Sequence, residues 1–364
     1  MNERMQEQLN RIVIKGFKSI KEWDIELKNI NVLIGANGAG KSNFISIFEM
    51  LQKVLSRELA LYVGKKGLSP LLYNGKKTTN SVYMEFHFGC IQYSYDLEWT
   101  ENNNLFFREE SLCIEGRELL GYGGHLESYA LNTMRMSEVD ADIPLFLLNP
   151  SWHVYQFHDT SPSSRIKCEN NISNSVNLMN DARNLAAYLY RMKQSYPKEY
   201  GNIIQAIQLV APFFDSFVLE PKELNQEQII LKWKKKGCED VFNAAQFSDG
   251  TLRFICLATL LLQPTKLQPS TIIIDEPELG LHPFAITILA EMVQKAAVNK
   301  QVILATQSVE LLDNFDVEDI IAVDNGDKNG SEFKRLDEEQ LKLWLDNDYT
   351  LGELWNKNIL GGRP

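Results

Sequence analysis

Several features are missing from this sequence, and each absence narrows the class of protein. No stretch of about 18 apolar residues occurs, so we expect no membrane span and no membrane partner. Residues 1–10 are polar and charged without the apolar centre of a secretory signal, so we expect no such signal. The five cysteines form no CxxC pair, which argues against a zinc site and a disulfide framework, so we expect a reducing, cytoplasmic setting. No internal repeat or sustained heptad pattern is present, which excludes a long coiled coil.

An excess of positive charge is also lacking. The chain carries 37 Lys and Arg against 48 Asp and Glu, for a formal net charge of −11. This balance argues against a uniformly basic surface for nucleic acid, although a local groove for DNA stays open. The segment Lys232–Lys236 places Trp233 among lysines, as a nucleic-acid contact could, or else it is a solvated hairpin tip.

The most informative motif that is present runs from Gly35 to Ser42 and has the form GxxxxGK[ST]. It follows the apolar run Ile30–Ile34, a predicted strand, and precedes Asn43–Leu51, a predicted helix, which is the context that a phosphate loop needs. Backbone N–H groups of such a loop surround a polyphosphate, and the helix N-terminus adds partial positive charge. Lys41 would reach the outer phosphates of ATP, and the Ser42 hydroxyl would ligate the accompanying Mg²⁺. The residues expected to contact the nucleotide here are Gly35, Asn37, Gly38, Gly40, Lys41, Ser42 and Asn43.

Residue patterns predict the rest of the secondary structure. Period-two alternation predicts strands over 11–17 and 23–27 and an antiparallel hairpin over 82–88 and 91–97, within a β-rich stretch from about 78 to 160. The helix after the phosphate loop is expected to continue to about Tyr62. Helical spacing predicts two helices within 177–210 with a break at Pro197 and Gly201, and a strand pair is expected over 217–234.

The last third of the chain alternates between helix and strand. The predicted elements are a helix over 249–262, a strand over 271–275, a helix over 283–298, a strand over 301–305, a helix over 308–314 and a strand over 319–323. Such alternation predicts a parallel sheet flanked by helices, and therefore an α/β fold class. We expect a single domain over 1–364, with an N-terminal lobe over 1–165, a mainly helical insertion over 166–240 and a C-terminal lobe over 241–364.

A second half of a nucleotide site follows the strand Thr271–Asp275. Its apolar run is typical of a central parallel strand, and ligands bind at the carboxyl ends of such strands. Asp275 would hold the Mg²⁺ shell, and Glu276 would polarise the attacking water. A buried strand that ends in a solvated acidic pair is the plain alternative, and the upstream phosphate loop favours the catalytic interpretation.

Taken together, four motifs resemble those of a known ATPase class. They are Gly35–Ser42 with Asn43, Ser248–Asp249–Gly250 at a helix start, Asp275–Pro283, and Ala305–Ser308. In order and spacing they resemble the RecF/SMC-like branch of ABC-type ATPases, and more narrowly the ATPase part of the overcoming-lysogenization-defect (OLD) family. The resemblance spans Arg11 to about Val323 and implies a P-loop NTPase fold, an ABC ATPase head with a β-rich lobe and a helical insertion.

The resemblance also implies roles for residues outside the phosphate loop. Ser248 and Gly250 would grip the γ-phosphate bound to a second copy, and Leu279–Pro283 would be the loop that crosses between the copies. Gln307 stands where many ABC ATPases carry a switch histidine, so it would orient and sense without acting as a base. Gln156 is the candidate for the glutamine that completes the metal shell, with an ordinary strand-end glutamine as the alternative. A metal or hydrolase role for His153 and His158 lacks supporting carboxylate spacing.

The implied activity is ATP hydrolysis coupled to a homodimer that closes on ATP and Mg²⁺. OLD nucleases carry a Toprim domain after the ATPase, and we expect none here, so the effector would be a separate protein encoded nearby, such as a Toprim-like nuclease, or DNA. The resemblance suggests a role in bacterial anti-phage defence or DNA maintenance. A second hypothesis is a slow or non-hydrolysing nucleotide-gated scaffold or antitoxin-like regulator, and a transporter ATPase is a third.

Overall fold

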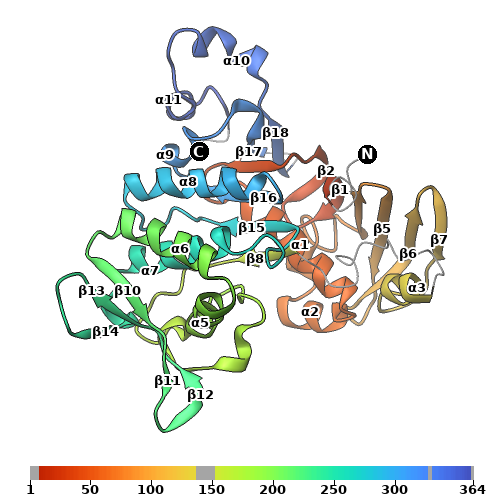
Figure 1. The fold of residues 1–364 in the computed structure, drawn as a ribbon. Helices are drawn as coiled ribbons and strands as arrows, with labels where there is room; N and C mark the ends of the chain where they lie inside the picture. Colours follow the sequence, from red (N-terminus) through yellow and green to blue (C-terminus); the bar gives the residue numbers. More distant parts are fainter. Residues whose placement is uncertain (1–7, 137–151, 327–329, 362–364) are drawn as a thin grey trace. The chain divides into compact units, whose positions relative to one another are not determined.

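The computed structural model describes residues 8–136, 152–326 and 330–361. The chain divides into two compact units (Figure 1). Unit 1 comprises Met1–His153 together with Asp316–Pro364, and unit 2 comprises Val154–Phe315. In Figure 1, the red-to-ochre N-terminal segment and the blue C-terminal segment therefore belong to the same unit. The phosphate loop lies in unit 1, whereas the acidic pair and the Ser248 turn lie in unit 2.

Unit 1 is built on a sheet in which the strands follow the order β7-β6-β5-β4-β1-β2-β18-β17-β3. β17 runs parallel to β3, and the remaining neighbours run antiparallel. The predicted hairpin is confirmed as β4 and β5, with Phe88 opposite Ile91. The strands are β1 (Leu9–Phe17), β2 (Ile20–Glu26), β3 (Ile30–Ile34), β4 (Ser81–Phe88), β5 (Ile91–Trp99), β6 (Leu105–Ile114), β7 (Arg117–Tyr122), β17 (Ile320–Gly326) and β18 (Gly330–Arg335).

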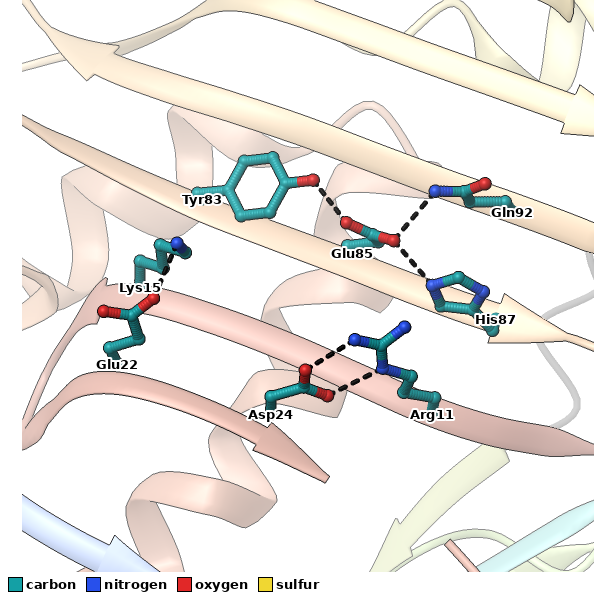
Figure 2. Close-up of polar contacts among 8 residues, drawn as sticks. All are labelled: Arg11, Lys15, Glu22, Asp24, Tyr83, Glu85, His87 and Gln92. Atoms are coloured by element: carbon teal, nitrogen blue, oxygen red, sulfur yellow. Dashed lines mark hydrogen bonds and ion pairs between the residues drawn. The ribbon is translucent and has the colours of Figure 1, made fainter. Parts of the chain in front are cut away.

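The two faces of this sheet have different chemistry. Phe44 of α1 (Lys41–Leu55) packs against Trp23 and Phe333, with ring centroids 5.1 and 6.1 Å away, so α1 covers the apolar face. Figure 2 shows side chains that β1, β2, β4 and β5 place outside this core, where Glu85 accepts hydrogen bonds at the centre of a polar cluster. Side chains along these strands alternate between the core and the polar face, which agrees with the two-residue period that predicts the strands from the sequence.

The helix after the phosphate loop ends earlier than predicted. α1 stops at Leu55, and a separate helix α2 (Leu59–Lys66) follows, so a continuous helix to Tyr62 is wrong. Arg57 adopts a left-handed conformation with φ 59°, and Glu58 N donates 2.8 Å back to Lys53 O, as in a Schellman ending. The other α-helices among the described residues of unit 1 are α3 (Ala130–Met136), α10 (Glu338–Leu345) and α11 (Leu351–Asn356).

Unit 2 contains the parallel pair β15 (Thr271–Asp275) and β16 (Gln301–Thr306) with helices around it. The predicted helix over 249–262 and strand over 271–275 are confirmed as α7 and β15. The helices are α5 (Leu185–Ser195), α6 (Pro197–Val210), α7 (Asp249–Leu262), α8 (Pro283–Ala297) and α9 (Val309–Leu312). The other strands are β9 (Asn170–Asn171), β10 (Phe214–Val218), β11 (Pro221–Lys222), β12 (Asn225–Ile229), β13 (Lys232–Lys235) and β14 (Val241–Asn243), while β8 (Trp152–Tyr155) spans the boundary between the units.

Two predictions for unit 2 need correction. Pro197 is the first residue of α6 and separates it from α5, but Gly201 lies inside α6 and does not contribute to the break. Trp233 is not an exposed aromatic among lysines, because β13 pairs with both β10 and β14 and buries the indole in a stack on Phe247 at 4.4 Å. The turn that follows β13 does carry Lys236, in keeping with a hairpin.

Part of the predicted β-rich stretch, residues 137–151, lies outside the described residues. Among the helices that the structure does describe, none combines the length and apolar character that crossing a bilayer requires.

Candidate functional site

The phosphate loop joins β3 to α1 and is held from behind by close packing. A Cβ on Gly35 would stand 2.5 Å from Val323 O, and one on Gly40 would stand 2.1 Å from Ser331 Oγ. Gly38 adopts φ 82° at the exposed tip of the loop, and a Cβ there would meet no heavy atom within 4 Å apart from its chain neighbours. The loop therefore requires glycine for packing at two positions and leaves room at the third, as a phosphate cradle does.

The start of α1 has no side chain that caps it. Gly40 is the N-cap residue, with φ 121°, and Lys41 begins the helix. Lys41 is 6% exposed, and its Nζ donates to Gly35 O at 2.6 Å and to Ala36 O at 3.0 Å, so the ammonium lies within the curve of the loop. Uncapped N–H groups and an adjacent ammonium both attract an anion.

Asn43 connects the loop to residues that the sequence did not single out. Its Nδ2 donates to Ser19 Oγ at 2.7 Å, and Ser331 Oγ also lies 2.7 Å from Ser19 Oγ. The Asn43 side chain thus points to Ser19 in the β1–β2 turn, and Ser19 in turn contacts β18, while Ser42 beside Asn43 is exposed. Because Ser19 and Ser331 are 312 residues apart, no local pattern could have revealed them.

In unit 2 the acidic pair ends the fully buried strand β15. Asp275 is 9% exposed and remains in the strand, and Glu276 turns the chain with φ 45° while its N–H donates 2.8 Å to Ala305 O. A left-handed conformation costs a residue with a side chain about 1 kcal/mol, so the surrounding contacts must impose it. Oε1 of Glu276 accepts a hydrogen bond of 2.7 Å from Gln307 Nε2, which brings together two residues predicted for catalysis.

A second carboxylate, Glu278, lies beside this pair. Its Oε1 accepts a hydrogen bond of 3.1 Å from Gln307 N, so Gln307 is held through its side chain by one glutamate and through its backbone by the other. Burial raises the pKa of Glu278 above its ordinary value, and the nearby Glu276 charge acts in the same direction. Glu278 lies within the motif Asp275–Pro283, but the sequence assigned it no role.

The Ser248 turn caps α7. Ser248 Oγ accepts a hydrogen bond of 3.2 Å from Thr251 N, and Ser248 and Asp249 are both exposed. A Cβ on Gly250 would lie 2.2 Å from Gly280 O, so the glycine allows the helix start to pack against the loop after Glu276. The predicted residues Ser248 and Gly250 thus occupy an accessible helix N-terminus within unit 2.

The segment that follows β8 contains Gln156, whose side chain is exposed and whose N–H donates 3.0 Å to Asn180 O. The neighbouring His158 approaches the acidic pair instead, with Nε2 2.9 Å from Asp275 O. Groups of three or more His, Cys, Asp and Glu placed to hold a metal are absent from the described residues. The hydroxyl of Ser42 in unit 1 and the carboxylate of Asp275 in unit 2 are each a hard oxygen donor of the kind that Mg²⁺ takes.

Comparisons with known proteins agree with these features. The family model "AAA domain, putative AbiEii toxin, Type IV TA system" matches residues 30–112 and 123–313. No curated protein matches the chain. One similar solved structure is the Smc head bound to the C-winged helix domain of ScpA, with a TM-score of 0.59 and 17% identity over 92% of this chain and 99% of that chain. Another is the Pyrococcus furiosus Smc head with an extended coiled coil bound to the C-terminal domain of ScpA, with a TM-score of 0.58 and 16% identity over 93% of this chain and 99% of that chain.

A Pyrococcus yayanosii Smc head with a coiled coil and joint matches at TM-score 0.52 and 12% identity over 93% of this chain and 99% of that chain. At these identities the likeness shows the fold, which is the ABC-type P-loop ATPase fold of SMC heads, as the sequence predicted. The narrower resemblance to OLD proteins stays a prediction. Because the family model covers residues 30–112 and 123–313, the chain belongs to the AAA-domain family described as putative AbiEii toxins of type IV toxin–antitoxin systems.

Proposed function

We propose that this protein is an ATPase in which ATP and Mg²⁺ join two copies of the chain, and that this dimer controls an effector protein or DNA. The observation that carries the proposal is the carboxylate of Glu276, which the structure places in a strained turn after a buried parallel strand and fixes through Gln307. A carboxylate positioned at the carboxyl end of a central strand, in a chain with a complete phosphate loop, has few roles other than activating water at a phosphoryl group.

Binding of ATP is assigned to Gly35–Ser42. The uncapped N–H groups at the start of α1 would hold the phosphates, and Lys41 would turn from the loop carbonyls towards their outer oxygens. Ser42 and Asp275 would hold Mg²⁺, which neutralises phosphate charge. Gln156 remains a further candidate for this shell.

Hydrolysis is assigned to Glu276 and Gln307. Glu276 would accept a hydrogen bond from the attacking water and orient it, and the amide of Gln307 would keep the carboxylate in place. Since Gln307 cannot take up a proton, it contributes orientation only. This arrangement favours slow ATP turnover that depends on closure of the dimer around the nucleotide.

Dimerisation is proposed from the separation of the two parts of the nucleotide site along the chain. Ser248 and Gly250 of one copy would meet the triphosphate held by the other, so ATP would act as a link and hydrolysis would release it. The family description names a type IV toxin–antitoxin system, and two of the similar Smc heads are bound to ScpA domains. Both support a separate macromolecular partner, for which anti-phage defence or DNA maintenance is the proposed setting.

The test compares the parent with Glu276→Gln. The variant keeps the side-chain shape but loses the charge, so it should bind ATP, hydrolyse it at least about 100-fold more slowly and accumulate as a dimer. Phosphate release measures the rate, and light scattering measures the mass. Glu310→Gln is the matched control. Among the described residues the Glu310 carboxylate accepts one hydrogen bond, from Ser308 Oγ at 3.0 Å, so this variant should hydrolyse ATP like the parent. Equal rates for Glu276→Gln and the parent would refute the assignment.

A nucleotide-gated scaffold or antitoxin-like regulator is the second candidate. The observation that favours it is the neutral amide of Gln307 bonded to Glu276, where a histidine could exchange a proton. A scaffold would close on ATP and hold its partner without measurable turnover. Rates measured with and without DNA, and with and without the product of the adjacent gene, separate the two candidates.

A further inference from the structure

The guanidinium of Arg253 connects three segments of unit 2. Arg253 lies in the first turns of α7, just after the Ser248 cap. Its Nη1 donates to Leu279 O at 3.0 Å, its Nη2 to His158 O at 3.0 Å, and its Nε to Phe157 O at 3.3 Å. One side chain therefore joins the start of α7 to the loop after Glu276 and to the segment after β8.

Two glycines show how tightly α7 and this loop fit. Gly280 has φ 75°, and a Cβ there would stand 2.6 Å from Arg253 Nη1. A Cβ on Gly250 would stand 2.2 Å from Gly280 O. The main chain at the start of α7 thus contacts the main chain of the loop, and we call this contact the junction. The Arg253 guanidinium contacts the loop at the same junction.

The chemistry of the acceptors explains why this residue is an arginine. Its acceptors among the described residues are the main-chain carbonyls of Leu279, His158 and Phe157 and, at 3.4 Å, the neutral hydroxyl of Thr160. Arg253 therefore responds mainly to backbone position and not to a partner's charge. A planar fork with five N–H donors reaches three carbonyls at once, whereas a lysine ammonium is a single point on a flexible stem. His158 Nε2 lies 2.9 Å from Asp275 O, which ties the same junction to the end of β15.

We propose that Arg253 is a positioning residue that makes the Ser248 turn and the loop Leu279–Pro283 one rigid element. This inference rests on the proposed dimer, because these two parts are the ones expected to face the second copy. When they are held together in advance, closure on ATP does not have to order them separately, and the entropy cost of association falls. Without the guanidinium each part would have to be ordered during closure.

The experiment uses full-length protein in the Glu276→Gln background. Arg253→Met keeps an unbranched side chain but removes all donors, and we expect its ATP-dependent dimer to be about tenfold weaker in sedimentation velocity. Binding of a fluorescent ATP analogue to dilute protomers should stay within about twofold of the parent, because the hydrogen bonds of Arg253 among the described residues lie within unit 2 and the phosphate loop belongs to unit 1. Arg253→Lys should recover part of the association. Arg191→Met is the matched control, since Arg191 also donates to two carbonyls, Ser175 O at 3.0 Å and Val176 O at 2.6 Å.

Gly280→Ala disturbs the same junction independently. It forces a Cβ into contact with the Arg253 guanidinium, so it should weaken association in the same way, and the double variant with Arg253→Met should be no worse than the stronger single variant. Association of Arg253→Met or Gly280→Ala equal to the parent, or effects that simply multiply in the double variant, would overturn the inference.

The same measurements separate this inference from the proposed function. Failure of the Glu276→Gln protein itself to associate on adding ATP would contradict the dimer. Association of that protein together with unchanged association of both junction variants would contradict only the role of Arg253.

Discussion

Removing the Gln307 side chain should slow hydrolysis without weakening ATP binding. In Gln307→Ala, Glu276 loses the amide that donates 2.7 Å to its Oε1, while its backbone stays held by the 2.8 Å bond from Glu276 N to Ala305 O. A hydrogen bond to a charged group is worth about 1.5–3 kcal/mol. Because Glu276 is partly exposed, solvent lowers the value of its hydrogen bond from Gln307 to about 1–2 kcal/mol. Loss of this bond therefore corresponds to a decrease of about 5- to 30-fold in the rate of hydrolysis.

The assay is steady-state phosphate release over a range of ATP concentrations. We expect kcat of Gln307→Ala to fall by about tenfold and KM to change by less than about twofold, because the lost contact orients a catalytic group and touches no part of the phosphate loop. In Gln307→His an imidazole N–H could replace the amide donor, so kcat should return to near the parent value. Gln294→Ala is the matched control, since the Gln294 side chain, in the same unit, donates to a single group among the described residues, Asn314 O at 2.7 Å. An unchanged kcat in Gln307→Ala, or a rise in KM alone, would refute the reasoning.

Three further predictions concern unit 1. Lys41→Ala should abolish ATP binding in calorimetry, while Lys53→Ala, which removes an ammonium on the same helix that pairs with Glu58 at 2.5 Å, should bind like the parent. Glu110→Ala should lower the free energy of unfolding by about 3 kcal/mol in urea titrations, because this fully buried carboxylate accepts from Tyr93 Oη at 2.7 Å and its loss leaves buried donors unpaired; a change below about 1 kcal/mol would contradict this. Burial raises the pKa of Glu85, but the hydrogen bonds shown in Figure 2 outweigh it and hold that pKa below its ordinary value, so the stabilisation from Glu85 is present above the unfolded pKa and is lost as the pH falls through the folded one. Glu85→Gln should therefore lose less stability than the parent between about pH 6 and pH 3, measured by thermal unfolding, and identical pH profiles would contradict the assignment.

The elements around the motifs could be predicted because their signals are local. The strand Thr271–Asp275 has an apolar centre, Ile272–Ile274, and is buried throughout, and the Ser248 cap marks the start of α7 at the predicted residue. β4 and β5 carry the alternation of a sheet with one buried face. In each case the pattern that selects the element also determines which face is buried.

The errors arise where tertiary contacts decide. No glycine or proline marks the end of α1, because Arg57 itself takes the left-handed position that usually signals glycine. Gly201 is tolerated within α6, since a glycine in a helix costs only about 1 kcal/mol. The lysines around Trp233 favour an exposed position, but pairing of β13 on both sides buries the indole.

The same distinction separates the site residues that the sequence identifies from those that only the structure identifies. Lys41, Asp275 and Glu276 belong to motifs that are contiguous in sequence, so they could be chosen directly. Glu278 and Arg253 act through contacts with loops about 30 and 95 residues away, and only the fold reveals them. These contacts link the motifs to each other, which is information that a single motif does not contain.

The central claim is that one nucleotide site is completed by two copies of the chain, and mixing two defective variants tests it most directly. In the Glu276→Gln background, Lys41→Ala should fail to hold ATP and Ser248→Arg should hold it without closing. Neither variant alone should associate on adding ATP, whereas the equimolar mixture should form a dimer with one intact site. Light scattering that reports only protomers in the mixture, or a dimer of Ser248→Arg alone, would contradict the account.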